Sequence, residues 1–347
     1  MNAKTVKAIR TPGGLSVRVD PRMAAVVLLL TAAVAAAGVV LIGSGDFPIS
    51  PGEVIATLLG NGTPAQEFIV QDLRLPRALV GLLVGASLAL SGAIFQSISR
   101  NPLGSPDVIG FGQGATVGAL SVIVIFDAGA VAVAGGAVVG GVLTGVAVYL
   151  LAWKRGVHGY RLVLVGIGIA AMLTAANHYL LTKASLVDAT QATLWMTGSL
   201  DGRDWAEFWP LLGMCAVLVP LVFMYGRPLR MLEMGDDAAY ALGVPVERTR
   251  VVLMGSGVVL IAVATAAAGP IAFVALSAPQ LARRLTRSPG PNLAAAAVMG
   301  AALLLVADWV ATTAFGERQL PVGVVTGVLG GCYLLWLLVT ERKAGRI

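Results

Sequence analysis

The chain consists of long apolar runs separated by short polar segments. Apolar runs of roughly membrane-spanning length recur at 23–42, 77–98, 107–126, 130–152, 162–181, 207–225, 250–268, 271–286, 292–312 and 322–339. A helix needs roughly 20 apolar residues to cross the hydrocarbon core, whereas the strands of a membrane barrel would alternate over about ten residues. The pattern therefore predicts an all-α polytopic membrane protein with ten transmembrane helices. The runs 107–126 and 271–286 are the least regular, because glycines interrupt the first and Pro279 interrupts the second.

The composition agrees with this pattern. Of the 347 residues 57% are hydrophobic and only 12% are charged, and the mean hydropathy is +0.85. Soluble domains average about 25% charged residues, so a soluble enzyme is excluded, and disordered chains are too poor in apolar residues to match. We predict one membrane domain over 23–340, between a basic N-terminal tail at 1–22 and a short tail at 341–347.

The basic residues orient the predicted helices. An even number of spans places both termini on one side, and 19 of the 24 Lys and Arg residues then fall on that side. Cytoplasmic loops carry the excess of Lys and Arg, so we predict cytoplasmic N- and C-termini. The same asymmetry accounts for the net charge of +6 without a nucleic-acid partner. The outer side receives Arg74, Arg77, Lys183, Arg203 and Arg318.

The spans offer little chemistry of their own. Within these boundaries only Asp308 is ionisable and well inside a span, whereas proton relays use several such residues; we interpret Asp308 as a capped or interfacial residue. No Gly-Lys pair occurs, so the chain has no P-loop and no ATPase site of its own. His158, His178, Cys215 and Cys332 lack metal-ligand spacing, and we expect no catalytic, cofactor or metal site on the chain.

An outer segment before the second span runs Leu73-Arg74-Leu75-Pro76-Arg77. Two arginines outside the membrane oppose the positive-inside trend. They could dock an acidic partner, or they could be a pair whose stems extend along the interface.

Two breaks interrupt the helical pattern. After the second span the segment 101–106 holds Pro102, Gly104 and Pro106, which prevent a continuous helix; it is either a substrate gate or a plain cytoplasmic turn. Gly269-Pro270 gives a similar break after the seventh span. The breaks occupy corresponding positions of two five-span halves, which would be inverted because five is odd.

The cytoplasmic segment 230–250 predicts a short helix. Asp236 and Asp237 favour a helix start through the dipole, the residues through Leu242 extend it, and Gly243 ends it. A helix of about two turns is unstable alone in water, so this one packs against a cytoplasmic partner or against the inner ends of the spans.

Six motifs in this order carry a resemblance to a known family. They are Arg74-Leu-Pro-Arg77, Gly85-Ala-Ser-Leu-Ala-Leu-Ser-Gly92 with Gln96, Asn101-Pro-Leu103, the segment Gly235-Asp236-Asp237 to Leu242-Gly243, Gly269-Pro-Ile-Ala-Phe273 to Ala278-Pro-Gln280, and Leu320-Pro-Val-Gly323. The chain resembles the permease subunits of bacterial ABC importers for iron–siderophore complexes, haem and vitamin B12. The resemblance extends from the first span to the tenth.

The resemblance implies an assembly in the bacterial cytoplasmic (inner) membrane. Two permease subunits form a pair, an extracytoplasmic substrate-binding protein feeds it, and two ATPase subunits that hold ATP and Mg drive it. Arg74 and Arg77 would dock the binding protein, and Asn101, Pro102 and Leu103 would form part of the cytoplasmic gate. The ATPase-coupling segment would comprise Leu232, Gly235, Asp236, Asp237, Ala238, Ala239, Leu242 and Gly243.

One departure from the family pattern narrows the expected cargo and the expected pairing of permease subunits. Many members carry Pro-His in the eighth span, whereas this chain has Pro279-Gln280 followed by Arg283-Arg284. That version is similar to the second permease of ferric-enterobactin-type importers, so we expect a heterodimer rather than a homodimer and a ferric siderophore as cargo. Haem or vitamin B12 is the alternative within the family. A stand-alone secondary transporter or an intramembrane enzyme would require ionisable clusters or a catalytic constellation, which the sequence does not display.

Overall fold

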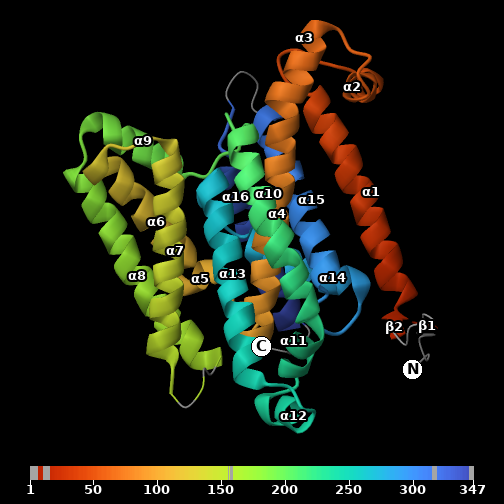
Figure 1. Ribbon diagram of the computed structural model, residues 1–347, viewed down its shortest axis with the longest axis vertical. Coiled ribbons are helices and arrows are strands. Elements are labelled where there is room, and N and C mark those ends of the chain that lie inside the picture. The colour runs from red at the N-terminus through yellow and green to blue at the C-terminus, as the bar shows by residue number, and fades with distance from the viewer. Residues whose placement is uncertain (1–6, 11–15, 155, 157–158, 315–318, 344–347) are drawn as a thin grey trace.

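A computed structural model describes residues 7–10, 16–154, 156, 159–314 and 319–343. The described part is a bundle of helices with one two-stranded antiparallel hairpin near its N-terminal end. Figure 1 shows the bundle with its long axis vertical. Predictions that concern Lys4, Arg155, His158, Arg318 and Arg346 lie outside the described residues.

The elements follow one another along the chain with few long connections. They are β1 (Lys7–Arg10), β2 (Ser16–Val19), α1 (Pro21–Gly43), α2 (Pro51–Leu58), α3 (Pro64–Glu67), the π-helical η1 (Phe68–Arg74), α4 (Leu75–Ser99), α5 (Pro106–Ile109), α6 (Phe111–Ser121), the π-helical η2 (Val122–Phe126), α7 (Ala130–Ala152), α8 (Gly159–Lys183), α9 (Leu186–Met196), α10 (Trp205–Met224), α11 (Gly226–Leu232), α12 (Asp236–Ala241), α13 (Val246–Ala268), α14 (Val274–Thr286), α15 (Leu293–Thr313) and α16 (Val322–Lys343).

Every predicted apolar run lies largely in helix. Among the described residues seven helices are long and apolar enough to cross a membrane, and two shorter apolar helices cover Phe111–Phe126 and Val322–Leu337. The remaining run, predicted at 271–286, is the 13-residue α14. The chain is therefore a multi-pass helical membrane protein. The small helices α2 and α9 and the hairpin β1–β2 were not predicted, because none of them contains a long apolar run.

The predicted interruptions shape the centre of the bundle. α4 ends where Arg100 adopts a left-handed conformation, with a φ of 51°. The third run, which the sequence analysis describes as interrupted, is divided at Gly110 (φ 94°), which separates α5 from α6. α13 ends at Gly269 (φ 73°), and α14 begins only after the left-handed Phe273. Both breaks therefore use backbone conformations outside the helical region.

α4 is the helix around which the others pack. Of the most apolar window of Pro64–Ser99, 78% is buried, compared with 11% for α8 and 17% for α1. Its glycines allow close approach: a Cβ at Gly85 would collide with the carbonyl oxygen of Gly300 in α15, and one at Gly92 with that of Ala275 in α14. The small residues of this segment thus place three backbones in direct contact, as small residues do between helices in lipid.

A second glycine contact joins α6 to α7. Gly114 and Gly118 face Gly140 and Gly136, each against the other helix's backbone. The spacing of four residues in both helices predicted such packing, and these two helices are partners. The pair Gly323 and Gly327 behaves differently, because only Gly323 lies against another backbone, that of Thr197.

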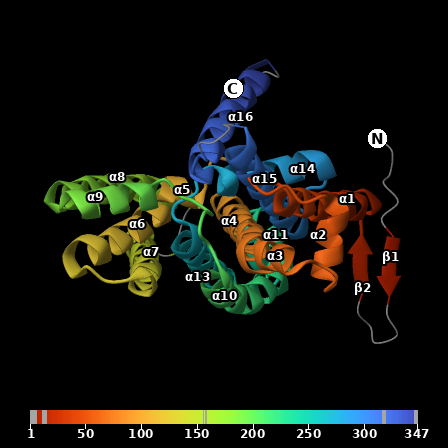
Figure 2. The same ribbon diagram turned by 90° about the horizontal axis from the view of Figure 1, so that it is seen from above.

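The two ends of the bundle hold different elements. α2, α3 and α9 lie at the end drawn uppermost, whereas α11, α12 and the start of α1 lie at the opposite end (Figure 1). Seen from above, α8 with α9 and, separately, α16 project away from the central helices (Figure 2). The predicted outer arginines and the predicted coupling segment therefore belong to opposite ends.

The Gly92 contact yields a stability prediction. Gly92→Ala should lower the thermal unfolding temperature in detergent, because the new methyl group meets the Ala275 carbonyl oxygen, although alanine is intrinsically favoured over glycine in a helix by about 1 kcal/mol. Gly213→Ala in α10, where nothing lies within 4 Å of the added carbon, is the matched control. Equal unfolding temperatures for the two variants would contradict the contact.

Candidate functional site

The predicted outer segment contains a buried ion pair. Arg77 Nε and Nη2 donate to the two carboxylate oxygens of Asp308 at 3.0 and 2.9 Å. The Asp308 side chain is 1% exposed and that of Arg77 17%. A third bond, 3.2 Å long, runs from Arg77 Nη1 to the largely exposed Asp201. The first turn of α4 is thereby fastened to α15 by a bidentate pair, the strong form of carboxylate recognition by arginine.

The interpretation of Asp308 as a capped or interfacial residue is therefore wrong. A carboxylate this far inside needs a partner, and the partner is one of the arginines that opposed the positive-inside trend. Hydropathy alone could not reveal the pairing, because the two residues lie 231 positions apart.

Arg74 is also held by its own chain. Its Nη1 donates to the carbonyl oxygen of Ile42 at 2.8 Å and its Nη2 to that of Phe47 at 2.9 Å. These bonds satisfy carbonyl groups at and after the end of α1, where no following helical turn supplies N–H donors to them. Both predicted docking arginines thus hold the outer end of the bundle together, and their role toward a binding protein stays a prediction.

The predicted gate loop is a turn bonded to a distant helix. Asn101 Oδ1 accepts from the Leu103 N–H at 2.9 Å, which closes the turn, and Asn101, Pro102 and Leu103 are all exposed. The Pro102 carbonyl accepts from Gln280 Nε2 of α14 at 2.8 Å. The sequence singled out Gln280 only as a departure from the family pattern and assigned it no role.

The two helix breaks touch each other. The Phe273 N–H, directly before α14, donates to the buried carboxyl group of Asp107 in α5. The second carboxyl oxygen of Asp107 is buried and has no hydrogen-bond partner among the described residues. The predicted run began at residue 107, so this ionisable side chain was not recognised as lying inside the bundle.

The coupling segment forms a small folded unit at the lower end. α11 and α12 are joined at Gly235, whose φ of 113° is open to glycine but strained for other residues. Leu232, Ala239 and Val244 are buried against one another. Asp236 accepts two bonds from Arg250 Nη2, both at 2.9 Å, and the Arg250 side chain is 4% exposed. The predicted helix exists, and its inner face rests on the chain's own α13.

The other face of this unit is open. Met234, Tyr240 and Leu242 are 68%, 77% and 59% exposed, and Asp237 is exposed beside them. Large exposed apolar side chains beyond the predicted membrane region mark an interaction surface. The eight predicted coupling residues thus divide into an inner set, which includes Leu232, Ala239 and Asp236, and an outer set, which includes Asp237 and Leu242.

A polar cluster links the coupling segment to the bundle. Glu233, which follows α11, accepts a 2.6 Å bond from Ser97 Oγ at the end of α4. The same carboxylate pairs with Arg283 Nη2 of α14 at 3.1 Å. Arg283 Nη2 also lies 3.2 Å from Ser97 Oγ. These three side chains connect α4, α14 and the coupling segment at one point.

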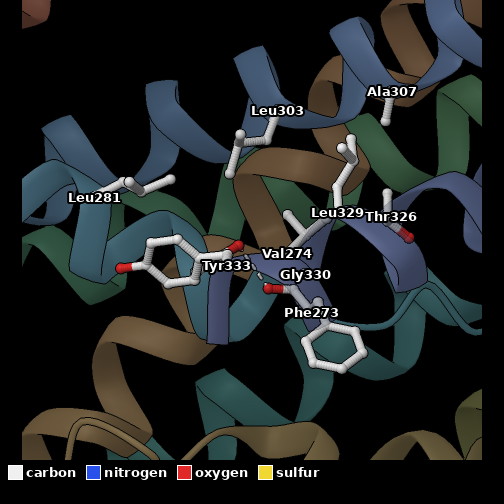
Figure 3. A pocket seen from close by; sticks show the side chains of 10 residues that line it. Phe273, Val274, Leu281, Leu303, Ala307, Thr326, Leu329, Gly330 and Tyr333 are labelled. Atoms are coloured by element: carbon white, nitrogen blue, oxygen red, sulfur yellow. Dashed lines mark hydrogen bonds between the residues drawn. The ribbon is translucent and has the colours of Figure 1, made fainter. Parts of the chain in front are cut away.

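α14 has a further partner in α16. The Tyr333 hydroxyl donates to Gln280 Oε1 at 3.3 Å. Beside it a cavity of about 80 Å³ lies between α14, α15 and α16, lined mostly by apolar side chains such as Leu281, Leu303 and Leu329 (Figure 3).

In the part of the chain that the structure describes, no three His, Cys, Asp or Glu side chains are grouped to hold a metal ion.

Comparison with known proteins gives the class and then the family. A fold of this kind occurs in a solved structure assigned to the metal-chelate type of ABC transporter in an inward-facing conformation, with a TM-score of 0.79 and 27% identity over 92% of this chain and 99% of that one. The profile of the FecCD transport family matches residues 23–340. The chain belongs to the FecCD transport family, and the resemblance inferred from its motifs is confirmed.

Curated relatives match along nearly their whole length. The chain is 47% identical to the ferric enterobactin transport system permease protein FepG of Escherichia coli K12, over 94% of this chain and 98% of that protein. It is 38% identical to the achromobactin transport system permease protein CbrC of Dickeya dadantii, over 91% and 90%. It is 33% identical to the vitamin B12 import system permease protein BtuC of Escherichia coli O9:H4, over 86% and 90%.

Substitution of Arg77 distinguishes a structural role of this residue from a role in docking the binding protein. Arg77→Ala leaves the buried Asp308 carboxylate unpaired and should cost about 3–5 kcal/mol of stability. Arg203→Ala, which removes the more exposed Arg203–Glu207 pair at the same end, should cost about 0–1 kcal/mol. Thermal unfolding in detergent measures both effects. An Arg77→Ala protein as stable as the parent, with weakened binding-protein affinity, would instead establish docking as the role of Arg77.

Proposed function

We propose that this chain is the permease subunit of an ATP-driven ABC importer that moves a ferric siderophore across the bacterial cytoplasmic membrane. The observation that carries the proposal is the end-to-end match, at 47% identity, to a ferric enterobactin permease. The achromobactin permease supports the same class of cargo. Vitamin B12 is the second candidate because a vitamin B12 permease matches along most of the chain at 33% identity, and haem is a further alternative on the sequence resemblance.

The energy source in this proposal is a separate pair of ATPase subunits, which bind ATP and Mg. Two observations support it: the sequence has no P-loop, and the α11–α12 unit offers an exposed apolar face with Met234, Tyr240 and Leu242. We assign this face to the ATPase. The buried Leu232 and Ala239, and the pairing of Asp236 with the buried Arg250, keep the unit folded and so present that face.

The proposed topology has ten spans over 23–340, short tails at 1–22 and 341–347, and both termini in the cytoplasm. The lysine and arginine asymmetry supports the orientation, as does the location of α12 at the end opposite to α2 and α9 (Figure 1). The five-span halves would form an inverted repeat, supported by breaks at corresponding places that contact each other through Asp107 and Phe273.

The extracytoplasmic binding protein docks at the outer end in this proposal. Arg74 and Arg77 fix that surface, and Arg77 also orients the exposed Asp201. A second permease subunit completes the pore, and a heterodimer is favoured over a homodimer by the Pro279-Gln280 variant of the eighth span. Asn101, Pro102 and Leu103 form part of the cytoplasmic gate.

The test of the cargo is uptake of radio-labelled iron offered with a panel of siderophores, in cells with and without this gene. We expect uptake to be lost for one chelate class and restored by the intact gene. Labelled haem and vitamin B12 belong in the same panel. Loss of only one of these two would move the assignment to that cargo, and unchanged uptake of every compound would overturn the importer proposal.

The coupling face has its own test. Tyr240→Asp combined with Leu242→Asp puts charge into the proposed interface, so capture of the ATPase subunits by the tagged permease should fall about tenfold or more, as expected for interface anchors. Leu59→Asp, an equally exposed leucine at the outer end, is the control and should leave capture unchanged. Undiminished capture by the double variant would exclude this face as the contact.

A further inference from the structure

We propose that α14 relays the position of the ATPase-coupling segment to the cytoplasmic gate loop, with Arg283 and Gln280 as its two positioning residues. The inference rests on the proposed importer function. Its basis is a pair of contacts on one helix: Arg283 binds the coupling segment, and Gln280, three residues earlier, binds the gate loop. Three residues of α-helix are about one turn, a rise of about 4.5 Å, so both contacts lie on neighbouring positions of one helix.

The contact with the coupling segment is a three-member cluster. Glu233 accepts from Ser97 Oγ at 2.6 Å and pairs with Arg283 at 3.1 Å, and both charged side chains are mostly shielded, at 22% and 31% exposure. Hydrogen bonds to ionised groups are shorter and stronger than neutral ones. Because Glu233 directly follows α11, a movement of that helix reaches α14 through Arg283.

The Arg283 guanidinium has one unsatisfied hydrogen-bond donor. Its Nε is buried and has no hydrogen-bond partner among the described residues. An unsatisfied buried donor costs about 1–3 kcal/mol, so this arrangement is not the most favourable one for Arg283. A second arrangement of the cluster that satisfies Nε would remove this cost, and in the proposed relay α14 adopts it when the coupling segment moves.

The contact with the gate loop uses both ends of one amide. Gln280 Nε2 donates to the Pro102 carbonyl at 2.8 Å, and Oε1 accepts from the Tyr333 hydroxyl at 3.3 Å. The Gln280 side chain is buried. The amide therefore holds the loop from one side while α16 fixes its orientation from the other.

A proline separates the fixed end of α14 from the end that carries these contacts. Near its start α14 is pressed against α4, where the Ala275 carbonyl faces Gly92. Pro279 has no N–H to donate to that carbonyl, which lies four residues earlier, and so weakens the helix between the two points. Gln280 and Arg283 both follow Pro279. They move together relative to the fixed Ala275.

The experiment measures the gate loop directly in the full importer, with its second permease and ATPase subunits. Cys215 and Cys332 are first replaced by Ser, and Leu103, which is 44% exposed, is replaced by Cys. The rate of maleimide labelling at 103 is compared in the nucleotide-free and vanadate-trapped complexes. In the parent we expect the two rates to differ by about fivefold or more.

The relay predicts that Gln280→Leu and, separately, Arg283→Ala reduce this difference to less than about twofold while ATP hydrolysis continues. Glu233→Arg combined with Arg283→Glu should restore it, which a misfolded protein could not do. Ser277→Ala is the control on the same helix, because its hydroxyl donates to the carbonyl oxygen of Phe273, the residue directly before α14, and it should behave as the parent.

Three outcomes would overturn the relay: equal labelling rates in the two states of the parent, an undiminished difference in Gln280→Leu and Arg283→Ala, or no recovery in the charge-swapped pair. Labelling depends on nucleotide state and needs no cargo. If labelling follows the prediction but no siderophore, haem or vitamin B12 is transported, the relay stands and the proposed cargo fails.

Discussion

A polar group at membrane depth must find its partner inside the protein, and this constraint fixes how the helices of this chain are arranged. Arg77 and Asp308 join α4 to α15 at the outer end. Near the other end of α4, Gln96 Nε2 donates to the Leu276 carbonyl of α14 at 2.9 Å. Lipid offers these groups no alternative, so each pair selects one register between two helices whose apolar faces could slide. The glycine contacts then set how close the backbones come.

The sequence predicted the local features of the fold and missed those that join distant segments. Apolar runs gave the helices, and Gly269 marked a break that the structure retains. Pairings such as that of Arg77 with Asp308 were not predicted, because hydropathy is evaluated in windows far shorter than the separation of the two residues. Two anomalies were nevertheless visible: a positive charge on the outer side and a lone acid inside a span. An unpaired charge costs free energy at either place. Considered together, the outer arginine and the acid inside the span would have predicted their own pairing.

The coupling segment shows the same division. Helix capping and Gly243 predicted a short helix between 230 and 250, and α12 lies there. The side of α12 that faces the bundle could not be predicted from the sequence. It depends on the ion pair between Asp236 and Arg250 of the following helix. The gate loop is similar, because its prolines predicted a turn. Gln280, the residue that holds the turn, lies 178 residues after Pro102. In the sequence it was visible only as a departure from the family pattern.

The separation of Arg77 from Asp308 also has a consequence for biosynthesis. The ribosome adds about 5–20 residues per second, so the 231 residues between them take about 12–46 s to synthesise. During that interval the Arg77 guanidinium exists without the carboxylate that pairs with it in the finished protein. Asp201, the other acid that contacts Arg77, is made about half-way through the same interval. The growing chain therefore contains an exposed partner for Arg77 before α15, which carries Asp308, has been synthesised.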